Sequence, residues 1–171
     1  MKSYKVVVTG AFNAGKTEFI RTGSDIDIVT TERRISDSEL ADTKEETTVA
    51  MDYGQTRMDD TVFHLYGTPG QARFEFMWGI LAKEMDAYIV IVDSTDQGSL
   101  MDTKQIIRLF QKQAKVPYII AANKQDNASV LSPEEIARLM GVTDKVPVVS
   151  CVAHDKSAVL AVLQQLRALL A

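Results

Sequence analysis

An eight-residue loop with two glycines constrains this sequence more than any other feature. Residues 10–17 read GAFNAGKT, which fits the pattern G-x-x-x-x-G-K-[ST], and they follow the β-branched run YKVVVT at 4–9. A helix is expected to begin near Lys16. A strand, a glycine-containing loop and a helix in this order direct backbone N–H groups at bound phosphate. The alternative, a glycine-rich turn with an exposed lysine, accounts less well for this context.

The residue types of the loop suit phosphate binding. The glycines let the backbone wrap closely around phosphate oxygens. Lys16 is expected to reach the β- and γ-phosphates and so to assist catalysis, and the Thr17 hydroxyl is expected to bind Mg²⁺. Four further residues of the loop are predicted to bind the nucleotide: Gly10, Asn13, Ala14 and Gly15.

Predicted strands and helices alternate along the rest of the chain. Continuous apolar runs at 87–93 and 117–123 are typical of strands buried on both faces of a parallel sheet. Segments 48–54 and 61–66 flank a polar turn and are expected to form a hairpin. The pattern predicts an α/β P-loop fold: about six strands, mostly parallel, one antiparallel edge strand, and helices on both faces.

Length and composition fit a single domain over 1–171. The net charge of -4 argues against a partner nucleic acid held by bulk electrostatics. One cysteine excludes an internal disulfide. No apolar run reaches membrane-spanning length, and position 2 is not glycine, so we expect a cytoplasmic protein with no membrane anchor of its own.

A second motif, NKQD at 123–126, directly follows one of the buried runs. Ligands bind at the carboxyl ends of strands in such sheets. With the phosphate loop, this motif resembles the Ras-like small GTPases, whose signature here is N-K-x-D. The resemblance implies that Asp126 accepts hydrogen bonds from guanine, Asn123 braces the loop and the Lys124 stem covers the base. Adenine would leave the carboxylate unpaired, so GTP and GDP are the expected ligands.

A third segment, VSCVA at 149–153, resembles the S-A-K loop of the same family. The resemblance implies that Ser150 braces this loop and that the Cys151 backbone N–H faces guanine O6. The cysteine thiol is expected to be buried and unreactive. Neither His64 nor His154 is assigned a role.

The resemblance also places two switch segments, at about 22–48 and 67–84. The first is polar, and we expect it to become ordered only with γ-phosphate, with Thr48 binding Mg²⁺. In the second, the Gly70 N–H is expected to contact the γ-phosphate and Gln71 to orient the attacking water; the alternative for the glutamine is a solvated loop residue. The second segment is also rich in aromatic residues and Met, which suits both core and partner contacts.

One departure from the family pattern concerns the metal. The family reads D-x-x-G-Q where this sequence reads G-T-P-G-Q, with Gly67 at the aspartate position. This departure resembles a prokaryotic branch typified by the bacterial polarity regulator MglA, in which the preceding strand carries an aspartate. Asp52 has that place and shares a strand face with Thr48. Either Asp52 supplies the lost carboxylate, through a metal-bound water, or it faces solvent on an edge strand.

Three functions stay open. The first is a molecular switch that binds GTP with Mg²⁺ and hydrolyses it slowly, because Phe12 stands where a glycine would admit an arginine finger. The second is a GTP-binding scaffold with negligible hydrolysis. The third is an ATP-dependent small-molecule kinase, against which the NKQD motif argues. The MglA-like resemblance implies an effector or activating protein at the switches, of the roadblock or longin type.

Overall fold

The structure, a computed structural model, describes residues 1–36, 46–68 and 81–171, with the side chains of 31–50 outside the description. Its described elements are both strands and helices. In chain order they are β1 (Lys2–Gly10), α1 (Lys16–Gly23), β2 (Val29–Ser36), β3 (Glu46–Met58), β4 (Thr61–Gly67), β5 (Ala87–Asp93), the 3₁₀ turn η2 (Gln97–Ser99), α3 (Leu100–Gln113), β6 (Tyr118–Asn123), α4 (Pro133–Met140), β7 (Val148–Ser150) and α5 (Lys156–Leu170).

The strands of the described residues form one sheet in the order β2-β3-β4-β1-β5-β6-β7. Strands β4, β1, β5, β6 and β7 pair in parallel, whereas β3 runs antiparallel to both of its neighbours. The mostly parallel α/β fold expected from the sequence is therefore confirmed. The sheet has seven strands rather than about six, and its antiparallel strand is second from the edge.

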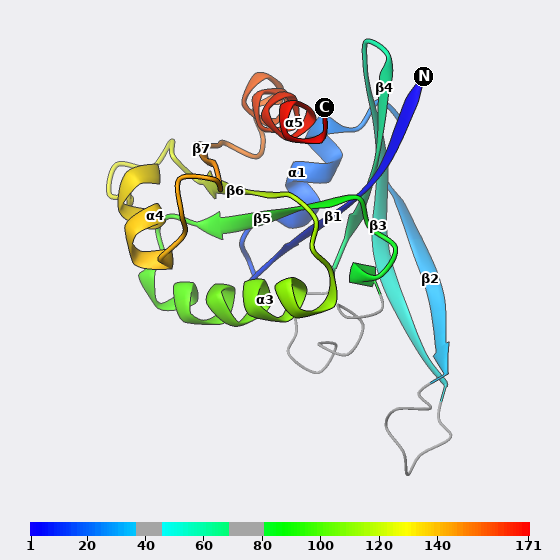
Figure 1. Ribbon diagram of the computed structural model, residues 1–171, viewed down its shortest axis with the longest axis horizontal. Helices are drawn as coiled ribbons and strands as arrows, with labels where there is room; N and C mark the ends of the chain where they lie inside the picture. Colours follow the sequence, from blue (N-terminus) through cyan, green and yellow to red (C-terminus); the bar gives the residue numbers. More distant parts are fainter. Residues whose placement is uncertain (37–45, 69–80) are drawn as a thin grey trace.

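The additional strand, β2, lies within the polar stretch that was expected to order only with γ-phosphate. It pairs with β3 from Val29 opposite Tyr53 to Ser36 opposite Glu46. Pairing satisfies the outer backbone groups of β3, which would otherwise form an open edge. A continuous apolar run indicates a buried strand, and this polar stretch has none. An edge strand needs no such run, so the sequence did not predict β2. Figure 1 shows β2 and β3 extending away from the helices as a long ribbon.

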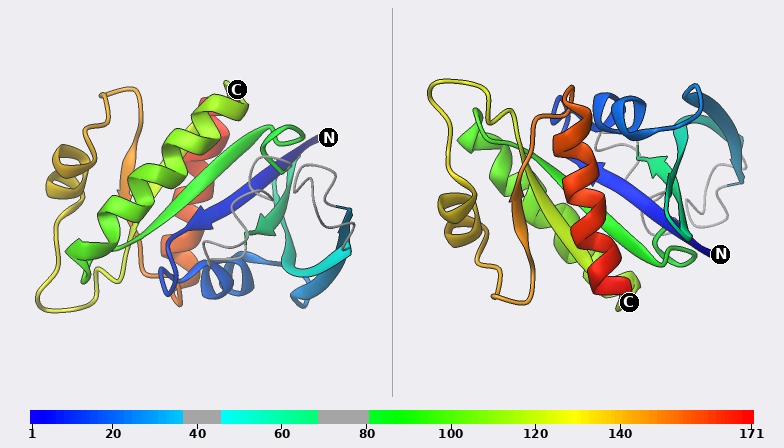
Figure 2. Two further views of the ribbon diagram at one scale, coloured as in Figure 1. Left: turned by 90° about the horizontal axis from the view of Figure 1, so that it is seen from below. Right: turned by 90° about the horizontal axis from the view of Figure 1, so that it is seen from above.

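Helices cover both faces of the sheet. Seen from below, α3 lies in front of the strands, and seen from above, α5 does (Figure 2). On the α1 and α5 face, Phe19 and Leu163 pack against strand residues such as Val8. On the α3 and α4 face, Phe110 and Ile136 pack on the opposite side of the same strands. β5 is buried along its whole length, as its apolar run predicts.

Local sequence signals fix the ends of the shorter elements. α4 begins with a capping box in which the Ser132 hydroxyl accepts from the Glu135 N–H, and Pro133 starts the helix. Gly141 ends it in the left-handed region, at φ 66°. Among the described residues, none of the helices combines the length and the apolar character that crossing a bilayer demands.

Candidate nucleotide-binding site

The predicted phosphate and base loops lie at one end of the sheet, where the parallel strands terminate. Because β4, β1, β5, β6 and β7 run parallel, the loops that follow them all emerge at their carboxyl ends (Figure 1). The loop 10–15 follows β1, the loop 123–126 begins at the end of β6, and the loop 151–155 follows β7. This is the end at which open α/β sheets bind ligands.

The phosphate loop has backbone angles that only small residues tolerate. Gly10 has φ 151° and Gly15 has φ 108°. A Cβ at Gly10 would collide with the Ile91 carbonyl oxygen, and one at Gly15 would collide with the side-chain amide of Asn123. Asn13 is also left-handed, at φ 64°. Both glycines are therefore required by the packing of the loop as well as by access of its backbone to a ligand.

Lys16 folds back over this loop. Its ammonium donates to the carbonyl oxygens of Gly10, at 3.0 Å, and Ala11, at 2.9 Å. Burial lowers the pKa of Lys16 to about 8, and the negative charge of Asp52 opposes that shift in part. A phosphate group in the loop would offer this ammonium charged acceptors in place of neutral carbonyls.

Thr17 and Asp52 lie side by side in the lining of a cavity next to the phosphate loop. The Thr17 hydroxyl donates to the Asp52 carboxylate over 2.6 Å. Both residues line a cavity of about 450 Å³, which Lys16, Gly67 and Phe12 also line. A hydroxyl and a carboxylate are oxygen ligands that suit Mg²⁺, which usually binds one or two protein oxygens together with substrate phosphates. These two side chains therefore fit a magnesium ion.

Gly67 leaves room for Asp52. The two residues are register partners on β4 and β3. A Cβ at Gly67 would lie 2.9 Å from Ile20 Cδ1 and 3.3 Å from the Asp52 Cβ. An aspartate at position 67 would thus need both neighbours to move. Asp52 is half-buried on β3, which is not an edge strand, and its carboxylate lines the cavity and accepts from Thr17.

Three further predicted residues lie wholly or partly outside the described part of the chain. Thr48 lies on β3 opposite Arg34, and its side chain is outside the described part of the chain. Gly70 and Gln71 lie in 69–80, also outside the described residues. Among the described residues of the second switch segment, Leu81 is buried in the core on the α3 face.

Asn123 joins three loops. Its side-chain amide donates to the Ala14 carbonyl, at 2.9 Å, and its side-chain oxygen accepts from the Ala153 N–H, also at 2.9 Å. The residue is 3% exposed, so both bonds are shielded from water. This geometry is the bracing expected of Asn123, and it ties the phosphate loop to the loop after β7.

Lys124 is held by a carboxylate that the sequence analysis did not single out. Its ammonium lies 2.7 Å from the carboxylate of Asp93, the last residue of β5. Burial acts to raise the pKa of Asp93, but hydrogen bonds from Lys124 and Thr95 outweigh it and lower that pKa. The sequence does hold a signal for this ion pair. Asp93 ends a fully apolar run, and an acid in a buried place nearly always has a partner.

Asp126 is bonded to a histidine that was assigned no role. Its carboxylate accepts from the imidazole Nε2 of His154 at 3.0 Å. His154 lies 28 positions further along the chain, so no local spacing predicts the contact. His154 lies in the loop after β7, so the pair is brought together by two loops that follow neighbouring parallel strands.

The loop after β7 differs from expectation in two respects. The Cys151 N–H donates to the Ala122 carbonyl at 2.9 Å, so it is not free to face a base. Ser150 is exposed at the end of β7, and its hydroxyl has no hydrogen-bond partner within the described residues. The bracing falls to Asn123 instead, and the backbone N–H groups of Val152 and His154 are the amides of this loop without a partner among the described residues. Burial raises the pKa of the Cys151 thiol to about 12, as expected for an unreactive cysteine.

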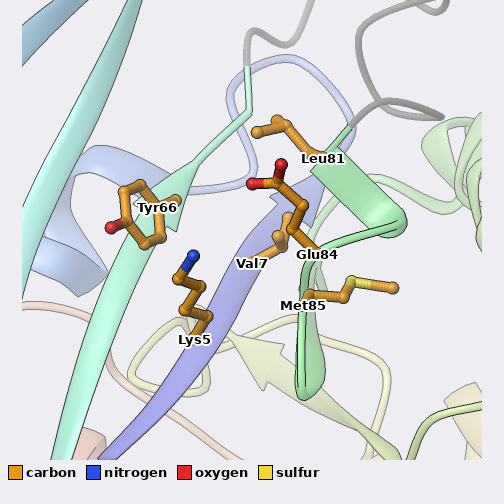
Figure 3. Close-up of a pocket in the computed structure, with 6 residues that line it drawn as sticks. All are labelled: Lys5, Val7, Tyr66, Leu81, Glu84 and Met85. Atoms are coloured by element: carbon orange, nitrogen blue, oxygen red, sulfur yellow. The ribbon is translucent and has the colours of Figure 1, made fainter.

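A second, smaller hollow lies between β1, β4 and residues 81–85 (Figure 3). The side chains of Lys5 and Glu84 project into it beside the Tyr66 ring. Its volume is about 20 Å³, enough for a water molecule. None of its lining residues belongs to the cavity at the phosphate loop.

Comparisons with known proteins identify the family and the fold of this chain. A curated archaeal protein, the uncharacterized protein MJ1339 of Methanocaldococcus jannaschii, is 34% identical over 113 residues, which are 66% of this chain and 64% of that protein. The alignment thus spans less than two thirds of the relative's length. The Arl6 (BBS3) small GTPase from Trypanosoma brucei, solved with the nucleotide analogue GppNp, has the same fold, with a TM-score of 0.76 and 21% identity over 99% of this chain and 98% of that one. Residues 1–169 match the model of the ADP-ribosylation factor family. The chain therefore belongs to the ADP-ribosylation factor (Arf) family of small GTPases.

Proposed function

We propose that this Arf-family protein is a molecular switch that binds GTP and GDP with Mg²⁺ and hydrolyses GTP slowly. The observation that carries the proposal is the bridge made by Asn123, which bonds to Ala14 of the phosphate loop and to Ala153 of the loop after β7. Through this one buried side chain, the groups for the phosphates and those for the base are held in a single site.

Guanine selection follows from the groups around the base loop. Guanine presents two N–H donors on one edge and the O6 acceptor beside them. Asp126 supplies a carboxylate acceptor, and the Val152 N–H supplies a donor that no other described residue uses. Adenine offers the reverse pattern at the O6 position and lacks the N1 proton, so it would leave both groups unpaired.

The metal would be held by side chains from the phosphate loop and from β3. Thr17 and Asp52 are already adjacent, and Thr48 is the third proposed ligand, with Asp52 acting directly or through a water. Side chains at these positions would hold a Mg²⁺ ion whose positive charge would offset the charge that develops on the phosphates during hydrolysis. Asp52 thereby takes the place of the carboxylate that Gly67 lacks. On this basis the protein is proposed to be an MglA-like variant within the small GTPases.

Slow hydrolysis is proposed from the surroundings of the phosphates. Gln71 would orient the attacking water and Lys16 would stabilise the transferred phosphate. Phe12 is 66% exposed at the rim of the cavity, where its ring would obstruct an arginine finger inserted by a partner. The same side chain favours the alternative function, a GTP-binding scaffold with negligible hydrolysis. A roadblock- or longin-type activating protein at the switches remains part of the proposal.

Two measurements test the proposal. Competition of GTP, GDP, ATP and ADP for the purified protein should show guanine nucleotides binding more tightly by orders of magnitude; equal binding of ATP would reject the switch. Single-turnover hydrolysis of bound GTP should then show cleavage that Gln71→Leu abolishes. If wild-type cleavage is no faster than in the variant, the scaffold is the correct function.

A further inference from the structure

We propose that His154 is a positioning residue of the base site, which holds the Asp126 carboxylate in the orientation that guanine requires. The proposal rests on the guanine site proposed above. The imidazole Nε2 of His154 lies 3.0 Å from Asp126 Oδ2, and the two residues come from loops that follow different strands. No local feature of the sequence connects them.

The backbone beside Asp126 is fixed by contacts that do not involve its side chain. The Gln125 N–H donates to the Cys151 carbonyl at 3.3 Å. The Gln125 side-chain amide donates to the Ser94 hydroxyl and the Leu131 carbonyl, each at 2.9 Å. Among the described residues, the Asp126 carboxylate bonds to His154 and, within its own loop, has a long contact of 3.5 Å to the Asn127 side chain and a hydrogen bond from its own backbone N–H. The orientation of the carboxylate therefore depends on His154.

The backbone that carries His154 is equally well fixed. The preceding Ala153 N–H is bonded to Asn123, and the following Asp155 caps α5 by accepting from the Ser157 N–H at 2.9 Å. The His154 imidazole therefore projects from a backbone that is held by hydrogen bonds on both sides. The bond to Asp126 consequently links the loop after β6 with the N-terminus of α5.

The charges around the imidazole favour this contact. The hydrogen bond to Asp126, joined by the charges of Glu18 and Asp155, raises the pKa of His154, and the same bond lowers the pKa of Asp126. Both side chains are largely exposed, at 65% and 46%, so the pair contributes little to stability. A carboxylate has about four lone-pair positions, and His154 uses one, which leaves acceptors for both N–H groups of guanine.

The expected effect is a loss of affinity that is specific to the base. Without His154, the Asp126 side chain would have to be ordered when the nucleotide binds, which costs roughly two- to tenfold in affinity. GDP affinity of His154→Ala should fall by that factor, mainly through faster dissociation, while pyrophosphate affinity and the melting temperature stay unchanged. His154→Gln, which keeps a side-chain N–H donor, should restore most of the affinity. His64→Ala is the matched control, because it removes the other histidine, which is bonded to Tyr53 and Ser3.

A double-mutant cycle decides whether His154 acts through Asp126. In the Asp126→Asn background, which keeps the size of the side chain, His154→Ala should have no further effect on GDP affinity. Wild-type affinity in His154→Ala, tighter binding in that variant, or additive losses in the cycle would each overturn the positioning role. Failure of the wild-type protein to prefer GDP over ADP would instead overturn the guanine site itself, and the role of His154 with it.

Discussion

The Asp52 carboxylate accepts a 2.6 Å hydrogen bond from Thr17, a residue 35 positions earlier in the chain. The contact joins β3 to the first turn of α1, and both residues line the cavity next to the phosphate loop. Gly67, the register partner of Asp52, favours this contact, because a side chain at position 67 would crowd Asp52 and Ile20. An aspartate on one strand and a glycine on the next are therefore a complementary pair, and the predictions below begin with the glycine.

Replacing Gly67 with alanine should destabilise the protein. The new Cβ would lie 2.9 Å from Ile20 Cδ1 and 3.3 Å from the Asp52 Cβ, in a region that is already packed. Overpacking of this kind costs about 1–3 kcal/mol of unfolding free energy, measurable by urea denaturation. Gly98→Ala is the control, since its one close neighbour is the Asp96 side chain at 3.3 Å. Equal stability of the two variants would show that the space beside Gly67 is not tight.

Nucleotide affinity should fall at alkaline pH because of Lys16. Its pKa is lowered to about 8 in the free protein, so below that pH the ammonium is charged and binds phosphate without first taking up a proton. Above about pH 8, binding must include protonation, and affinity should decline by up to about tenfold per pH unit. Fluorescent-GDP titrations between pH 6.5 and 9 measure this decline. The arginine of Lys16→Arg stays charged over this whole range, so the GDP affinity of that variant should not change with pH. A wild-type affinity that is equally independent of pH would contradict the lowered pKa of Lys16.

Replacing Asn123 with alanine should weaken both nucleotide binding and stability. The substitution leaves the Ala14 carbonyl and the Ala153 N–H without their partner in a buried place. Each unsatisfied buried group costs about 1–3 kcal/mol. Affinity for pyrophosphate should fall along with that for GDP, because the phosphate loop itself loses a tether. Asn127→Ala, an exposed neighbour whose amide bonds only to groups of its own loop, serves as the control and should behave as wild type. A loss confined to GDP would mean that Asn123 supports the base loop alone.

The sequence predicts most of the fold because buried parallel strands and glycine-dependent loops leave strong local signals. The fully apolar β5 and the paired Gly10 and Gly15 could each be recognised without a structure. β2 could not, since its sequence is polar and its pairing with β3 leaves no local signal in the chain.

The site was predictable to the same extent and for the same reason. Motif spacing located Lys16 and Asp126, whereas the partners of these motifs come from distant strands. Asp93 and His154 reach the base loop through the parallel order of β5, β6 and β7, which no spacing in the sequence encodes. The same holds for Cys151, whose N–H bonds to the Ala122 carbonyl of β6 directly after β7 ends, a contact that the motif itself does not predict.

The most direct test of the account is the Mg²⁺ dependence of GTP binding in Asp52→Asn. The substitution keeps the shape of the side chain but removes the charge beside Thr17. The Mg²⁺ concentration required for tight GTP binding should rise roughly 10- to 100-fold, while affinity for GTP without Mg²⁺ does not fall. Asp102→Asn, an exposed change of the same charge on α3, should leave both quantities unaltered. If Asp52→Asn has the same Mg²⁺ requirement as wild type, Asp52 does not replace the carboxylate missing at Gly67.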